Sequence, residues 1–274
     1  MPTSALLSRL GSDAAALAPA LAAEIGVDRN RLAVLFPALP RRFGRDAVRG
    51  GKTRLGPATV DLDAFRRCDL AAAWLLAQIG ATADEILDLF AHGDMEERAM
   101  LLRAQHFLPL DATTVKLLGE VQRTNIVLHL EAALCDGDLL LRVLQQGWLD
   151  ENGGNRLLLK LAFLDLPLQR AYGAETRANP ELSRMLQDLA TEREAAGRSV
   201  WRDTWRLIGR APCDGTVARL IGGLEHGDDG VRLAAAEGLL ALNRPDLRPF
   251  AAERLPREPR MSIQKLLRRL TGEA

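Results

Sequence analysis

From Leu62 onward, the chain is a succession of short amphipathic segments. Apolar residues recur at three- and four-residue spacing, and Gly, Pro or Asp separates each segment from the next. No stretch of four or more residues stands out as the apolar–polar alternation of a half-buried strand. The pattern therefore predicts an all-α fold. The segments expected to be helical are 63–79, 82–91, 95–107, 112–134, 138–147, 155–164, 180–197, 201–208, 214–225, 229–242, 246–254 and 261–270.

Composition supports this fold class. The 274 residues include 51 Leu and 41 Ala, which favour helices, whereas Val, Ile and Thr together number only 30. This balance argues against sandwiches, barrels and doubly wound sheets. The 36 basic residues match the 36 acidic ones, so no overall field attracts the chain to nucleic acid.

The N-terminal part looks different from the rest. Residues 4–40 predict two or three short helices, with Pro19, Pro37 and Pro40 expected to end them. The Gly- and Arg-rich stretch 41–60 is expected to be a loop. We divide the chain by pattern into 1–60, 61–210 and 211–274, which together form one continuous solenoid.

Cysteine usage and the absence of targeting segments predict a cytoplasmic protein. Cys68, Cys135 and Cys213 share no paired spacing, which favours a reducing compartment over a disulfide framework. The N-terminus lacks a basic stretch followed by an apolar core. The densest apolar run, 70–80, is too short to cross a bilayer.

One motif, H-G-D-x-x-x-R, occurs twice, at 92–98 and 226–232. Each copy lies between two apolar helical segments. Gly93 and Gly227 would permit a left-handed conformation at a helix end, and the following aspartates are expected to cap the next helix. The arginines can reach back to an acid or a carbonyl. The arrangement is similar to HEAT repeats, whose helix pairs of roughly 40 residues stack into a solenoid.

Several polar residues lie where the pattern predicts apolar ones. Asn125 falls on the apolar stripe of the expected helix 112–134, where it either braces a neighbouring helix or contacts a ligand. Lys160 lies in the apolar stretch 157–164, so a nearby carboxylate is expected. Lys160 could form a structural ion pair, bind an anion or, with a lowered pKa, act as a base or nucleophile. The candidate carboxylates are Glu131, Asp165, Glu181, Asp188 and Glu192.

The start of the next segment shows helix-capping chemistry. Asn179 is expected to be the N-cap, with Pro180 at the first helical position, and this leaves Arg177 unexplained. Further along, Glu192, Arg193 and Arg198 alternate in charge. They form a solvated face or hold a phosphate or carboxylate. Trp201 and Trp205 are one turn apart and are expected to cover the end of the core.

Signatures of common enzymes and metal sites are absent from the sequence. The four histidines have no HxxH or HExxH spacing and no cysteine companions, which predicts that no zinc is bound. There is no GxSxG, GxGxxG or complete P-loop, since the stretch 50–53 lacks the first glycine and a preceding strand. The sequence therefore predicts neither a metal nor a cofactor.

A set of motifs in this region is similar to that of the EboA family. The motifs are RTN at 123–125, N-x-x-x-x-K-x-x-F at 155–163 followed by Pro167-Leu168, RANPEL at 177–182, ER at 192–193, AGR at 196–198 and WRLIG at 205–209. The stretch 36–45 and the run 69–76 also resemble N-terminal parts of that family. One departure is Gly154, which stands where the family has a tryptophan. A pocket lined by that tryptophan would be wider here.

The resemblance implies an accessory role. Such proteins are encoded in bacterial gene clusters for making or exporting secondary metabolites, and no catalytic activity is established for them. We therefore expect a non-enzymatic helical scaffold whose concave face binds a small metabolite or another protein of the cluster. The residues expected on that face are Arg123, Asn125, Asn155, Lys160, Arg177, Asn179, Glu192 and Arg193.

Two alternatives remain open. The chain could be an enzyme in which Lys160 is a base or Schiff-base nucleophile and Glu192 or Glu181 is its acid partner. The basic helix expected at 261–270 could also make a peripheral membrane contact.

Overall fold

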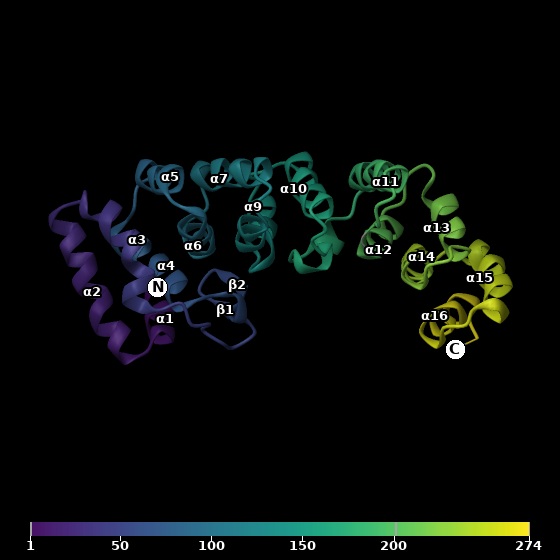
Figure 1. The fold of residues 1–274 in the computed structure, drawn as a ribbon, viewed down its shortest axis with the longest axis horizontal. Coiled ribbons are helices and arrows are strands. Elements are labelled where there is room, and N and C mark those ends of the chain that lie inside the picture. Colours follow the sequence, from purple (N-terminus) through teal and green to yellow (C-terminus); the bar gives the residue numbers. More distant parts are fainter. Residues whose placement is uncertain (1, 201, 274) are drawn as a thin grey trace. The chain divides into compact units, whose positions relative to one another are not determined.

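The computed structural model describes residues 2–200 and 202–273. Helices dominate this part of the chain, which confirms the all-α prediction (Figure 1). The helices are α1 (Pro2–Leu10), α2 (Ser12–Val27), α3 (Arg31–Phe43), α4 (Arg67–Ile79), α5 (Ala83–His92), α6 (Met95–Gln105), α7 (Ala112–Arg123), α8 (Val127–Leu130), α9 (Leu139–Gln145), α10 (Glu151–Phe163), α11 (Pro180–Ala195), α12 (Arg202–Arg210), α13 (Thr216–Leu224), α14 (Asp229–Leu242), α15 (Arg248–Arg254) and α16 (Met261–Thr271). None of the described helices is long and apolar enough to cross a membrane.

The chain forms two compact units, which are described separately. The N-terminal unit contains the residues up to 154 together with 170–172, and the C-terminal unit contains 155–169 and the residues from 173 onward. The division at 60 and 210 remains a prediction based on sequence pattern.

Helix α4 is the centre of the N-terminal unit. Every residue from Cys68 to Leu76 is buried, because α1, α2, α3 and α6 all pack against this helix. Helices α5 and α7 contact each other in a second layer, α5 packing on α6 and α7 on α8 (Figure 1). A helix that is apolar on all sides needs such complete coverage.

The proline prediction for this unit is wrong. Pro19 lies inside α2, and Pro37 and Pro40 lie inside α3. A proline in a helix interior costs about 3 kcal/mol because it removes a hydrogen bond and crowds the preceding turn. Helix α3 nevertheless buries Leu35, Phe36 and other large side chains, and this packing offsets the cost.

The stretch 41–60 is not only a loop. Strands β1 (Lys52–Leu55) and β2 (Ala58–Asp61) form an antiparallel hairpin in which Lys52 pairs with Asp61 and Leu55 with Ala58. Gly56 has a φ of 61°, as a tight hairpin turn requires. The second strand alternates buried and half-buried residues, so a four-residue alternation was present in the sequence.

The segment 112–134 is not one helix. Helix α7 ends at Arg123, α8 begins at Val127, and Glu131–Cys135 forms a π-helical turn. Thr124 is in an extended conformation, and its hydroxyl accepts a hydrogen bond from the backbone N–H of Ile126 at 3.1 Å. Short polar side chains stabilise such turns at the expense of the helix.

A chain of alternating charges joins elements of the N-terminal unit. Arg66, the N-cap residue of α4, pairs with Glu96 on α6 and with Asp69, 3.0 Å away. Arg103 lies 3.5 Å from Asp69 and 2.9 Å from Asp136. Arg170 continues the chain to Glu131 and, at 3.9 Å, to Asp136. Buried charges need partners of this kind, so we interpret this series of ion pairs as structural.

The C-terminal unit consists of consecutive helix pairs. Helix α11 packs on α12, α13 on α14, and α15 on α16 (Figure 1). The second helices of the pairs also contact one another, α12 with α14 and α14 with α16. Stacked pairs are what a repeat architecture requires. The assignment to HEAT repeats stays a prediction.

The two H-G-D-x-x-x-R motifs behave partly as predicted. Asp94 and Asp228 cap α6 and α14. Arg98 donates to the carbonyl of Ala91 at 2.9 Å, and Arg232 to that of His226 at 3.0 Å, so both reach back to the preceding turn. The glycines do not adopt the left-handed conformation that they would permit. Gly93 has a φ of −68°, since it leads in extended conformation into the N-cap, and Gly227 is not among the residues with positive φ.

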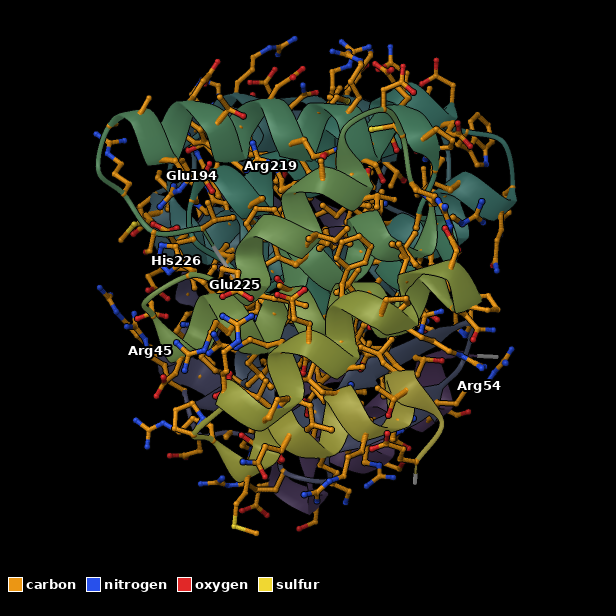
Figure 2. All side chains as sticks on the ribbon, turned by 90° about the vertical axis from the view of Figure 1, so that its right-hand side faces the viewer. Arg45, Arg54, Glu194, Arg219, Glu225 and His226 are labelled. Carbon is orange, nitrogen blue, oxygen red and sulfur yellow. The ribbon has the colours of Figure 1, made fainter. Side chains whose placement is uncertain are left out.

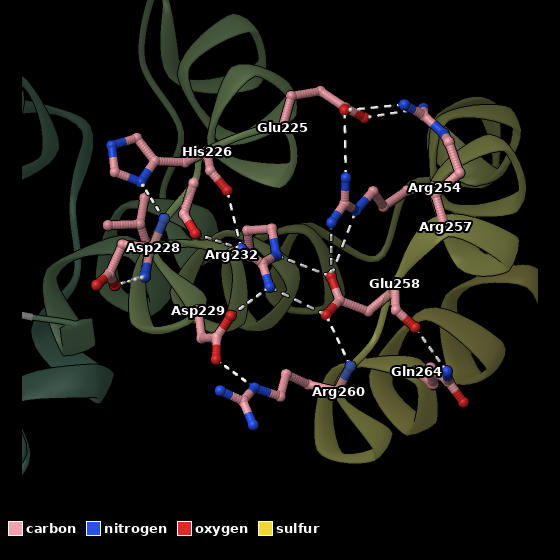
Figure 3. A network of polar contacts seen from close by, with 12 residues as sticks. Glu225, His226, Asp228, Asp229, Arg232, Arg254, Arg257, Glu258, Arg260 and Gln264 are labelled. Atoms are coloured by element: carbon pink, nitrogen blue, oxygen red, sulfur yellow. Dashed lines mark hydrogen bonds and ion pairs between the residues drawn. The ribbon is translucent and has the colours of Figure 1, made fainter.

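Arg232 also takes part in a network that the first motif lacks (Figure 3). It donates to the buried carboxylate of Glu258 at 2.9 Å, and Arg254 donates to the same carboxylate at 3.0 Å. Arg254 and Arg257 both bind Glu225 at the end of α13. The network ties the segment before α16 to α13 and α14.

Candidate functional site

Two of the residues predicted for the binding face, Arg123 and Asn125, belong to the N-terminal unit. Arg123 is exposed at the end of α7 and pairs with Glu120. Asn125 lies in the turn between α7 and α8 and is exposed, so its placement on a buried helical stripe is wrong. The break in the expected helix is the reason.

Asn155 and Asn179 form a buried reciprocal pair in the C-terminal unit. The Asn155 amide donates to Asn179 Oδ1 at 3.1 Å, and the Asn179 amide donates back to Asn155 Oδ1 at 2.9 Å. Asn179 Oδ1 also accepts from the backbone N–H of Leu182 at 2.8 Å, which confirms Asn179 as the N-cap of α11. These contacts attach α10 to the start of α11.

The charged residues predicted for the binding face of this unit lie in different environments. Lys160 is half-buried, and its Nζ lies 5.2 Å from the centre of the Phe163 ring. Arg193 is buried, and its guanidinium lies 2.6 Å from Asp165 and donates to the carbonyl of Ser199 at 2.8 Å. Arg177 is half-buried and Glu192 is exposed.

A hollow lies where the loops before α12 and α14 meet. Its volume is about 820 Å³, within the range of small-molecule sites. We call it the Trp205 hollow. It is lined by Gln169, Glu194, Gly197, Arg198, Ser199, Val200, Asp203, Trp205, Arg206, His226, Asp228, Gly230, Val231 and Glu237. Residues of the AGR and WRLIG motifs therefore share one wall.

A second cavity, of about 740 Å³, lies between α11 and α13. It shares Glu194, Trp205, His226 and Val231 with the Trp205 hollow. Figure 2 shows Glu194, Arg219 and His226 on the same side of the C-terminal unit. Arg219 bridges the two helices, donating to Glu194 at 2.9 Å and to the hydroxyl of Thr191.

Trp205 forms the boundary between the two cavities. Its side chain is only 4% exposed, and the Arg219 guanidinium lies 5.4 Å from the centre of the ring. The buried indole N–H has no hydrogen-bond acceptor among the described residues. The predicted packing role of Trp205 fits its burial, whereas Trp201 lies outside the described residues. The sequence did not indicate that Trp205 borders two cavities.

Helices α12 and α14 approach closely beside this tryptophan. A Cβ on Gly209 would lie 2.2 Å from the carbonyl oxygen of Gly238, and a Cβ on Gly238 would lie 2.7 Å from that of Trp205. Only glycine fits at both positions. Gly209, the glycine of the WRLIG motif, therefore allows α12 to pack closely on α14 and so sets the distance between Trp205 and α14.

The AG part of the AGR motif ends helix α11. Gly197 has a φ of 67°. The backbone N–H of Arg198 donates to the carbonyl of Arg193 at 2.8 Å, and the backbone N–H of Gly197 donates to the carbonyl of Glu194 at 3.0 Å. These bonds form a Schellman motif, which requires a residue with positive φ at this point. The arginine that follows is not needed for the motif.

The cysteines and possible metal ligands of the described residues are dispersed or buried. The described residues contain no group of three or more His, Cys, Asp or Glu that could hold a metal ion. Burial raises the pKa of the Cys68 thiol to about 11 and that of Cys135 to about 12, so both thiols stay protonated at neutral pH. Lys160 lines neither of the two cavities.

Comparison with known proteins identifies the family. The model of the metabolite traffic protein EboA matches residues 46–209, which excludes the resembling stretch at 36–45 and includes α11 and all of α12 but its last residue. No curated protein and no solved structure matches the chain. Since the family model covers more than half of the sequence, the chain belongs to the EboA family of metabolite traffic proteins.

Proposed function

We propose that this protein is a non-enzymatic accessory component that binds a small metabolite in the Trp205 hollow. The observation that carries the proposal is the hollow itself, with its volume of about 820 Å³ and a lining that includes the apolar side chains of Trp205, Val200 and Val231. Small-molecule sites combine such an apolar wall with a few polar groups. The family's description as a metabolite traffic protein gives the ligand its class.

The hollow replaces the concave face of the sequence prediction as the proposed site. Asn155, Asn179 and Arg193 bind other parts of the C-terminal unit, and their contacts support a structural role. Arg193 still acts on the site, because its bond to the carbonyl of Ser199 fixes the loop that lines the hollow.

The setting of this function also follows the resemblance. We place the protein in the cytoplasm, as a scaffold in a bacterial secondary-metabolite pathway whose other proteins receive or deliver the ligand. A HEAT-like solenoid suits this role, since stacked helix pairs offer extended surfaces to partners. Membrane contact remains a further prediction, supported by exposed Lys265, Arg268 and Arg269 on α16.

The hollow can be blocked without disturbing the core. Ser199 is exposed and lines the hollow, so Ser199→Trp should fill it, and Ser262→Trp places the same side chain on exposed α16 as the control. The probe is 1-N-phenylnaphthylamine, a neutral apolar fluorophore. Ser199→Trp should weaken its binding about tenfold or more, the equivalent of roughly two buried methylene groups, and leave the thermal midpoint unchanged. Equal binding by both variants, or none by the unmodified protein, would refute the proposal.

A further inference from the structure

We propose that the ligand of the Trp205 hollow is an organic anion whose carboxylate, sulfonate or phosphate group pairs with Arg198. This inference rests on the proposed function, because it concerns the chemistry of the same site.

Most charged side chains of the hollow are engaged. Arg206 pairs with Glu175, and Glu194 pairs with Arg219 at 2.9 Å. Asp203 accepts from the backbone N–H of Gln169 at 2.7 Å. Carboxylates outnumber guanidinium groups in this lining, but each of the acids named here already forms an ion pair or accepts a hydrogen bond.

The remaining carboxylates of the lining also have interaction partners. Asp228 accepts from the backbone N–H of Val231 at 3.1 Å as the cap of α14, and Glu237 makes a contact of its own. Among the described lining residues, Arg198 carries the one charged side chain for which no hydrogen bond or ion pair is found. A guanidinium binds carboxylate or phosphate oxygens through two parallel hydrogen bonds.

The backbone fixes where Arg198 lies. Its own N–H closes the Schellman motif of α11, and the next carbonyl, that of Ser199, accepts from the buried guanidinium of Arg193. A side chain that starts from an anchored loop loses less conformational freedom on binding. Arg198 is exposed, so its guanidinium is accessible to a ligand, and its N–H groups suit a ligand that carries acceptor oxygens.

A structural role for Arg198 gives a different expectation. A cation after the last turn of a helix stabilises it by interacting with the negative end of its dipole. If this were the function of Arg198, removing its charge would lower the thermal midpoint and would not distinguish an anionic ligand from a neutral one.

The test uses two fluorophores that differ by one anionic group. 1-Anilinonaphthalene-8-sulfonate carries a sulfonate, and 1-N-phenylnaphthylamine has the same rings without it. Arg198→Gln should weaken binding of the sulfonate about tenfold or more and leave binding of the neutral probe unchanged. Arg198→Lys keeps the charge but cannot form the two parallel hydrogen bonds, so it should bind the sulfonate more weakly than the unmodified protein and more tightly than Arg198→Gln. Arg268→Gln removes an exposed arginine of α16 that does not line the hollow, and should change neither value.

The outcomes separate the two proposals. If neither probe binds the unmodified protein, or if Ser199→Trp has no effect, the hollow is not the binding site. If both probes bind there and Arg198→Gln weakens both equally or neither, the site stands and the anion assignment fails. If Arg268→Gln weakens the sulfonate as much as Arg198→Gln does, the effect is one of net charge, and the assignment also fails.

Discussion

Replacing Gly209 by alanine tests the packing that positions Trp205. The added Cβ would lie 2.2 Å from the carbonyl oxygen of Gly238 and 3.0 Å from its Cα. Carbon and oxygen atoms without a bond between them approach to about 3.2 Å at the closest, and both groups facing the new methyl belong to the backbone. Neither can rotate away. Helices α12 and α14 must therefore separate by roughly 1 Å.

The expected cost is a loss of about 2–3 kcal/mol in the free energy of unfolding, at the upper end of the range for overpacking. Alanine is intrinsically about 1 kcal/mol better than glycine in a helix, so the observed loss is about 1–2 kcal/mol after that gain. For a chain of this size, 1 kcal/mol corresponds to roughly 2–4 °C. The thermal midpoint should therefore fall by about 2–8 °C.

The matched control is Gly222→Ala on α13. A Cβ at Gly222 meets nothing within 4 Å, and the residue is exposed. The same substitution should raise the midpoint there by a few degrees, because only the helix propensity changes. Both midpoints are measured by circular dichroism at 222 nm, a standard helix wavelength. A midpoint for Gly209→Ala at or above that of the unmodified protein would refute the close approach of α12 and α14, and with it the position assigned to Trp205.

Two further predictions concern buried titratable groups. Burial lowers the pKa of His106 from 6.5 to about 4, so the unfolded chain gains a proton before the folded one does. This group therefore withdraws up to about 3 kcal/mol of stability as the pH falls from 6.5 to 4, and His106→Gln should flatten the dependence measured by urea unfolding. Asp136, whose pKa burial raises to about 6, acts in the opposite direction in both proteins and cancels in the comparison. If the difference in unfolding free energy between the two proteins stays the same from pH 6.5 to pH 4, His106 is not buried as described. Glu258→Gln should cost about 3 kcal/mol, because it leaves the guanidinium groups of Arg232 and Arg254 without their shared carboxylate. The exposed Glu253→Gln should change stability by less than about 0.5 kcal/mol, and equal effects of the two would contradict the network.

The sequence pattern predicted most of the helices because the residues that determine a helix and its caps lie close together in the sequence. Helix α14 spans 229–242 as predicted, and the caps at Asp94, Asp228 and Asn179 formed as the side chains suggested. A capping side chain and its partner N–H are three residues apart, so sequence contains both. The arginines of the repeated motif reached the preceding turn for the same reason.

The errors occurred where packing overrode local preference. Helix α3 continues through two prolines because its apolar face is buried, and nothing within the helix itself reveals that. Helix 112–134 breaks at Thr124 although its apolar stripe continues beyond the break. In both cases, periodicity reports which residues prefer burial and says little about where the backbone must turn.

The site was predicted only in part, for a geometric reason. Motif resemblance pointed to the segment around Arg198 and Trp205, and also to Asn155 and Asn179, which pair with each other. A hollow is the space that remains between segments, so it depends on how closely helices approach. Here that distance is set by Gly209 and Gly238, which lie 29 residues apart in the sequence.

The family match covers only part of the residues that line the hollow. The match ends at residue 209, so it includes the wall that contains Arg198 and Trp205. The opposite wall, with His226, Asp228 and Val231, comes from the helix pair α13–α14 that follows. The matched segment alone would leave Trp205 facing solvent on that side. We therefore expect the pair α13–α14 to complete the hollow, and the side chains of this second wall to set which anion fits beside Arg198.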